Sequence, residues 1–229
     1  MPDRWTLELF EGHLIATNNG VRALLDTGSP LSIGRGGSVM INGQRFLRPE
    51  SAAGLSIASL TELVGCPFDV FLGIDILGQF RVLIDMSKNE IVFGSDTELH
   101  APTTVAIRPG SIIPIIDVTV GGRGYRAAFD TGAATSYVPS EAVQGAGPGR
   151  FVNDFYPGLG RFSIETWMLP IEVQSRIFRV SAGTLPENLR ALTLAFGIEV
   201  ILGSEALAGC RTVLDFPGHR IEFERGDDG

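Results

Sequence analysis

One short sequence pattern occurs twice in the chain, and this repeat limits the possible folds more than any other feature. The two copies are "LLDTGS" at 24–29 and "AFDTGA" at 128–133, so Asp26 and Asp130 are 104 residues apart (130 − 26). Further along, "FLGIDILGQFRVLIDMSKNEIVF" (71–93) matches "ILGSEALAGCRTVLDFPGHRIEF" (201–223). Gly73 to Asp85 and Gly203 to Asp215 are both 12 residues. Landmarks that keep register over some twenty positions indicate an internal duplication.

The residue pattern predicts an all-β fold with one or two short helices. The chain holds 29 Gly and 14 Phe, a mixture that favours short strands joined by tight turns. Before each aspartate, apolar strands are broken by turns such as Glu11-Gly12, Asn19-Gly20 and "GGRG" at 121–124. Helices are expected at 59–65 and 184–197, the second with Thr184 as N-cap and Pro186 in its first turn.

The polar segment "GSDTELHAPTT" (94–104) separates the two repeats, which predicts a first lobe at 1–97 and a second at 98–229. The separation between the aspartate and the glycine of the Leu-Gly pair is 47 residues in the first repeat (73 − 26) and 73 residues in the second (203 − 130). The 26 additional residues lie mainly in 149–175, which read as a strand, a Pro-Gly and Leu-Gly turn, and a second strand. We expect a hairpin there.

A single Asp-Thr-Gly is more often a plain turn than a site, and its glycine suits a sharp turn because it tolerates backbone angles closed to other residues. Two copies at the ends of equivalent strands carry more weight. If the repeats pack about a pseudo-two-fold axis, as equivalent units commonly do, the Asp26 and Asp130 carboxylates come together.

With "DTGS" (26–29), "DTGA" (130–133), "FLG" (71–73) and "ILG" (201–203), the chain resembles the pepsin and retroviral-protease superfamily of aspartic proteases over nearly its whole length. The resemblance implies a bilobal acid-protease fold and an endopeptidase in which Asp26 and Asp130 activate a water molecule without a metal or cofactor. The residues expected to support this pair are Thr27, Gly28, Ser29, Thr131, Gly132 and Ala133. Thr27 and Thr131 should link the two turns through buried hydrogen bonds.

The resemblance also implies that the 149–175 hairpin is a flap over the active site, carrying a tyrosine before a Gly-rich tip. The residues expected to bind substrate are Tyr156, Pro157, Gly158, Phe162 and Trp167. A decorative surface hairpin is the alternative, and core packing is the alternative for Phe162 and Trp167. Pepsin-like enzymes carry the flap in their N-terminal lobe, so its place in the second repeat predicts a swapped lobe order.

Charge and cysteine usage disfavour several other classes of protein. The net charge is −8 and Lys88 is the only lysine, so neither a nucleic-acid partner nor an anionic membrane is expected. Cys66 and Cys210 form no CxxC and the three histidines lie far apart, so we expect no metal site. The absence of a disulfide framework, of an N-terminal apolar signal region and of an apolar run long enough for a membrane span favours the cytoplasm.

The leading hypothesis is therefore a monomeric endopeptidase acting on extended peptides or unfolded proteins and inhibited by pepstatin-type compounds. A non-catalytic peptide-binding or regulatory module on the same fold is the first alternative, and a small β-barrel ligand carrier is the second. A hydroxyl at Ser29 can stabilise an ionised carboxylate, whereas Ala133 cannot. We therefore expect a milder pH optimum than in an enzyme with hydroxyls on both sides.

Overall fold

The computed structural model describes residues 2–157 and 159–225, and about half of them lie in β-strands, far more than in helices. This confirms the predicted all-β class. The described residues include three short α-helices: α1 (Ile57–Val64), α2 (Ile74–Leu77) and α3 (Glu187–Ala195). They also include two 3-10 helices, η1 (Ser140–Val143) and η2 (Ser204–Leu207).

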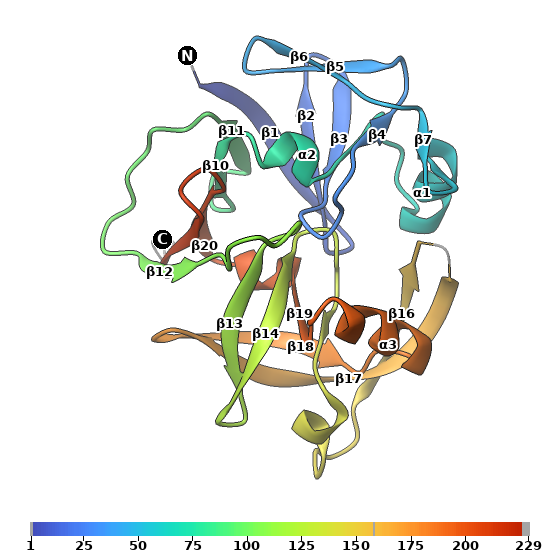
Figure 1. Cartoon of the computed structure of the whole chain (residues 1–229), viewed down its shortest axis with the longest axis vertical. Coiled ribbons are helices and arrows are strands. Elements are labelled where there is room, and N and C mark those ends of the chain that lie inside the picture. The colour runs from blue at the N-terminus through green and yellow to red at the C-terminus, as the bar shows by residue number, and fades with distance from the viewer. Residues whose placement is uncertain (1, 158, 226–229) are drawn as a thin grey trace.

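The larger sheet has ten strands and draws on both halves of the sequence (Figure 1). In spatial order its strands are β12 (Thr103–Ala106), β21 (Arg220–Arg225), β20 (Cys210–Asp215), β10 (Arg81–Asp85), β11 (Glu90–Phe93), β1 (Asp3–Phe10), β2 (His13–Asn18), β3 (Val21–Leu25), β9 (Val70–Leu72) and β4 (Ile33–Gly34). The division expected near residue 97 therefore does not separate the sheets, because β12, β20 and β21 of the second half complete this one.

The register between β10 and β20 relates the two repeats. Leu83 pairs with Val213, which is the equivalent position of the second repeat at an offset of 130 (213 − 83), the same offset as between Asp85 and Asp215. On either side of this pair, Arg81 lies opposite Asp215, and Asp85 lies opposite Arg211. Reciprocal pairing of equivalent residues is the pattern that a two-fold axis at this point produces.

The second sheet has seven strands, all from the second half. Its order is β13 (Ile115–Val120), β14 (Arg123–Asp130), β19 (Val200–Gly203), β15 (Ser136–Tyr137), β18 (Arg176–Gly183), β17 (Gly160–Val173) and β16 (Arg150–Tyr156), with β13 also pairing with β17. Two small two-stranded sheets belong to the first half: β5 (Ser38–Ile41) with β6 (Gln44–Leu47), and β7 (Ser51–Ala52) with β8 (Leu55–Ser56).

Both predicted helical regions contain a helix, with one difference in detail. A capping box between Ser56 and Ser59 begins α1, and Gly65 ends it in the left-handed conformation. In α3 the N-cap position is Pro186, which provides no side-chain hydrogen bond. The predicted cap at Thr184 is therefore wrong, because the chain turns into the helix two residues later.

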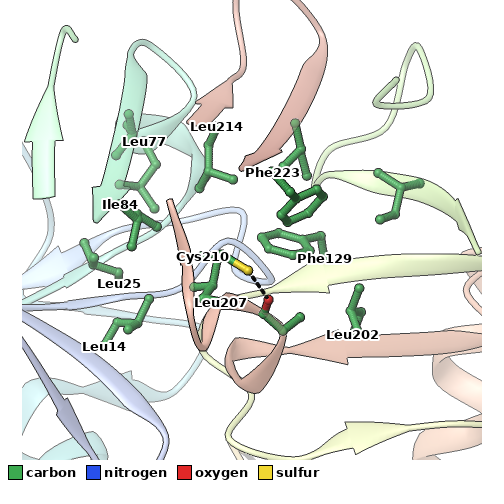
Figure 2. Close-up of a cluster of buried hydrophobic side chains, with 14 of the residues drawn as sticks. Leu14, Leu25, Leu77, Ile84, Phe129, Leu202, Leu207, Cys210, Leu214 and Phe223 are labelled. Carbon is green, nitrogen blue, oxygen red and sulfur yellow. Dashed lines mark hydrogen bonds between the residues drawn. The ribbon is translucent and has the colours of Figure 1, made fainter. Parts of the chain in front are cut away.

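The main hydrophobic cluster joins the two sheets. Figure 2 shows part of it, with Leu14, Leu25 and Ile84 of the first half near Leu207, Cys210 and Leu214 of the second. Phe129, which directly precedes Asp130, packs edge to face on Phe223 with ring centroids 5.8 Å apart. A smaller cluster around α1 contains Leu24, Leu60 and Phe71. The strands that end at the two aspartates are therefore anchored in buried apolar surroundings.

Candidate active site

The two Asp-Thr-Gly turns follow equivalent strands. Asp26 follows β3, which runs parallel to β9, and Asp130 ends β14, which runs parallel to β19. The Asp26 backbone N–H donates to Leu72 O at 2.9 Å, and Asp130 lies opposite Gly203 in the register. Each Leu-Gly strand thus supports the aspartate turn of its own repeat.

Thr27 and Thr131 join the turns by a reciprocal set of four hydrogen bonds, as expected from the resemblance. The Thr27 hydroxyl donates to Phe129 O at 2.6 Å and accepts from the Thr131 N–H at 3.0 Å. The Thr131 hydroxyl donates to Leu25 O at 3.0 Å and accepts from the Thr27 N–H at 3.1 Å. Both threonines are only 1% exposed, so these bonds are shielded from water and fix one turn against the other.

Gly28 and Gly132 are required by close approach rather than by an unusual backbone angle, since neither has a positive φ. A Cβ on Gly28 would lie 2.2 Å from Oδ2 of Asp130, and one on Gly132 would lie 2.3 Å from Cγ of Asp26. Each carboxyl group therefore packs on the glycine of the opposite turn. The sequence-based prediction that these glycines provide an unusual backbone angle for a sharp turn is therefore wrong, because the close approach of the opposite carboxyl group requires them.

The two Leu-Gly strands, β9 and β19, are fixed beneath the aspartate turns in the same way in both repeats. The Gly73 N–H donates to the Ser32 hydroxyl at 2.8 Å, and the Gly203 N–H donates to the Ser136 hydroxyl at 3.0 Å. A Cβ at Gly73 would lie 2.6 Å from Leu31 O, and a Cβ at Gly203 would lie 2.6 Å from Ala133 O. Backbone lies directly against backbone at these points, which only glycine allows.

The carboxyl groups of Asp26 and Asp130 both line the site between the two turns, and their surroundings resist joint ionisation. Burial raises the pKa of Asp26 well above its usual range, and the negative charge of Asp130 and a hydrogen bond with it act in the same direction. Burial also raises the pKa of Asp130, against an opposing hydrogen bond of 2.9 Å from the Gly132 N–H. We therefore expect the pair to titrate as a unit.

The difference between Ser29 and Ala133 does not act as expected. The Ser29 hydroxyl donates to Leu31 O at 3.0 Å, so it does not stabilise a carboxylate. Neither turn therefore supplies a side-chain hydroxyl to the aspartates at this position. This removes one influence that would lower the pKa values of the pair.

A cavity of about 380 Å³ lies over the aspartates, and both halves line it. Of the predicted substrate-binding residues, Tyr156, Pro157 and Phe162 border this cavity, whereas Gly158 lies outside the described residues. Burial raises the pKa of Tyr156, and the charges of Asp130 and Asp26 add to this, which places its phenol near the pair. Trp167 is not among the described lining residues, because its indole N–H is directed to Gly147 O at 2.7 Å.

The 149–175 segment forms the predicted hairpin, with β16 and β17 paired from Arg150↔Thr166 to Tyr156↔Gly160. In Figure 1 its tip points toward α1 of the first half. The Arg161 guanidinium donates from Nη2 to Glu62 O at 3.0 Å and to Leu63 O at 2.7 Å, both in the last turn of α1. Phe155 packs against the smaller apolar cluster of the first half. The hairpin thus bridges the cavity between the halves.

Sequence reasoning missed three polar residues of the cavity wall: His13, Tyr137 and Asp154. His13 begins β2, is 6% exposed, and its Nδ1 lies 3.0 Å from Gly132 O; burial lowers the pKa of its imidazole. Tyr137 donates its hydroxyl to the Asp154 carboxylate. Tyr137 follows the second Asp-Thr-Gly by a few residues, but nothing in the sequence marks its pairing with Asp154.

The described residues contain no group of three or more His, Cys, Asp or Glu side chains arranged to bind a metal ion. None of the helices in the described part of the chain has both the length and the apolar character that a membrane crossing requires. Comparison of the sequence with protein-family models and with curated proteins gives no match. The site itself presents two carboxyl groups on equivalent turns, both lining one cavity.

Proposed function

We propose that the chain is an endopeptidase that hydrolyses peptide bonds with a water molecule activated between Asp26 and Asp130. The observation that carries the proposal is the reciprocal threonine network, which sets two aspartates from different repeats on equivalent turns facing one cavity. A turn with a purely structural role has no need of a second carboxyl group held against it. Burial of two mutually repelling acids is costly, and such arrangements cluster at functional sites.

The protonation of the pair supplies both catalytic roles. Raised pKa values mean that the pair retains one proton over the range in which separate aspartates have lost theirs. The ionised carboxylate accepts a proton from water as the water oxygen attacks the peptide carbonyl carbon. The protonated carboxyl donates to the carbonyl oxygen, which becomes the hydroxyl of the tetrahedral intermediate. When the intermediate collapses, the carboxyl group that now holds the proton donates it to the departing amine, while the other carboxylate accepts a proton from a hydroxyl of the intermediate. The C–N bond breaks, and the pair again holds one proton.

The surroundings fit an extended peptide as the substrate. The volume of about 380 Å³ lies within the range typical of ligand pockets, and most of the wall is apolar, including Leu24, Ile33 and Phe71. The β16–β17 hairpin would cover the bound chain and exclude water from the reacting atoms. Because one chain provides both aspartates, we propose a monomer. The position of the hairpin in the second half supports the swapped order of the two lobes.

The test is cleavage of unfolded casein and of a peptide library between pH 3 and pH 7, with and without a pepstatin-type inhibitor. Asp26→Asn and Asp130→Asn are compared with Asp96→Asn, a matched change at an exposed aspartate. We expect cleavage by the wild type and by Asp96→Asn, and its loss in both dyad variants. Cleavage that survives either dyad substitution would contradict the mechanism. A folded protein that binds peptides without cutting them would instead be the non-catalytic module.

A further inference from the structure

Asp154 places a carboxylate on the cavity wall beside the proposed reaction centre. It lies on β16 two residues before Tyr156, and alternate residues of a strand point to the same face. Its carboxylate accepts hydrogen bonds from the Tyr137 hydroxyl and from the Phe155 N–H, the latter at 2.7 Å. These donors come from two different strands and hold the group in one orientation.

The cavity offers this carboxylate no cationic partner. The carboxylates that line it are Asp26, Asp130 and Asp154, its other titratable groups are His13, Tyr137 and Tyr156, and no described lining residue is Arg or Lys. The salt bridges of the described residues do not include Asp154. His13 directs Nδ1 to Gly132 O, and its burial favours the neutral imidazole near neutral pH. Asp154 is thus an uncompensated negative charge in a largely apolar wall.

The carboxylate can still accept from a ligand. Two carboxylate oxygens provide about four acceptor sites, and only two donors from the protein use them here. The Tyr137 phenol stays protonated, because burial and the charge of Asp154 raise its pKa, so it remains a donor. An ammonium or guanidinium group would complete the site with a charge-assisted bond, which is strengthened by the low polarity of the neighbouring wall.

We propose that Asp154, oriented by Tyr137, binds a lysine or arginine side chain at one position of the substrate close to the scissile bond. This inference rests on the proposed function and adds a substrate class to it. Most of the rest of the wall is apolar, so the other positions of the substrate carry mainly apolar side chains. A substrate of this kind combines one cationic residue with apolar neighbours.

The experiment is a positional scan at pH 6.5. Peptides of one sequence carry lysine or norleucine, which have similar length but differ in charge, at each of the six positions around the cleaved bond. For the wild type we expect one position at which lysine raises kcat/KM by about tenfold over norleucine, the size typical of a charge-assisted hydrogen bond. Asp154→Asn keeps an acceptor for Tyr137 and should bring that ratio close to one, whereas Asp96→Asn should leave it unchanged.

The outcomes separate the two proposals. Cleavage by the wild type without a lysine preference at any position overturns the subsite and leaves the peptidase intact, and this result needs no variant to fold. An equal preference in wild type and Asp154→Asn would also overturn it, since charge would then not be its source. If the folded protein cleaves nothing, the peptidase fails, and the same peptides are measured by fluorescence anisotropy. Tighter binding of lysine peptides supports the subsite there, and equal binding refutes it.

Discussion

Replacing Thr27 by valine tests whether the reciprocal threonine network holds the two turns together. Valine keeps the shape of threonine, so the change creates no cavity, but it removes one hydrogen bond to Phe129 O and one from the Thr131 N–H. Thr27 is 1% exposed, so water cannot replace the lost partner. An unsatisfied buried polar group costs about 1–3 kcal/mol, which gives a loss of about 2–6 kcal/mol in the free energy of unfolding for the two groups.

Thr27→Ser is the matched control, because it keeps the hydroxyl and loses one buried methyl group, for about 1 kcal/mol. Both variants are measured by urea unfolding followed through tryptophan fluorescence, with the slope of the transition checked for constancy. We expect Thr27→Val to be at least about 1 kcal/mol less stable than Thr27→Ser. If the valine variant proves as stable as the serine variant, the hydroxyl does not link the turns, and the account of the network is refuted.

Three further outcomes follow from the site. Because the pKa of Asp26 is raised on folding, the folded state binds its proton more tightly than the unfolded state, and stability is lost as pH rises from 3.8 through the raised value. Asp26→Asn should therefore be more stable than wild type in urea at pH 7, with a gain that shrinks below pH 4. No gain in stability at pH 7 would contradict this. The pKa of His13 is lowered in the folded state, so stability is lost as pH falls below 6.5. His13→Asn should therefore lose less stability than wild type between pH 7 and pH 5. Equal losses would count against a buried neutral imidazole. Arg161→Met removes the two bonds to α1 and should speed amide hydrogen exchange at Phe155, its partner in the hairpin, compared with the exposed-site control Arg179→Met. Unchanged exchange would show that Arg161 does not hold the hairpin.

Much of the fold could be predicted from the sequence because its signals are local. The Asn19-Gly20 turn, the strands on either side of it and the hairpin at 149–175 follow from turn chemistry and apolar patterning. The repeat identified which positions are equivalent, and Leu83 indeed pairs with its counterpart Val213. The sharing of one sheet by both halves was missed, since the pairing of β10 with β20 joins segments 130 residues apart.

The details of the site depended on contacts that no local pattern encodes. Gly28 is needed because Asp130 approaches it, and the approach exists only after both turns have folded together. Trp167 was expected at the cavity because it lies in the predicted flap hairpin, but its indole N–H donates to Gly147 O instead. His13 and Asp154 carried no signal in the sequence, because each gains its role from a partner on another strand.

The central claim is that Asp26 and Asp130 share one proton as a single titrating unit, and carbon-13 NMR of labelled aspartate carboxyl carbons measures this directly. In the wild type we predict two linked steps, with the upper one well above the ordinary value of 3.8. In Asp130→Asn the step of Asp26 should move to lower pH, because no neighbouring negative charge opposes its ionisation. A step of Asp26 that does not move when Asp130 is replaced, or two independent steps near 3.8, would contradict the account.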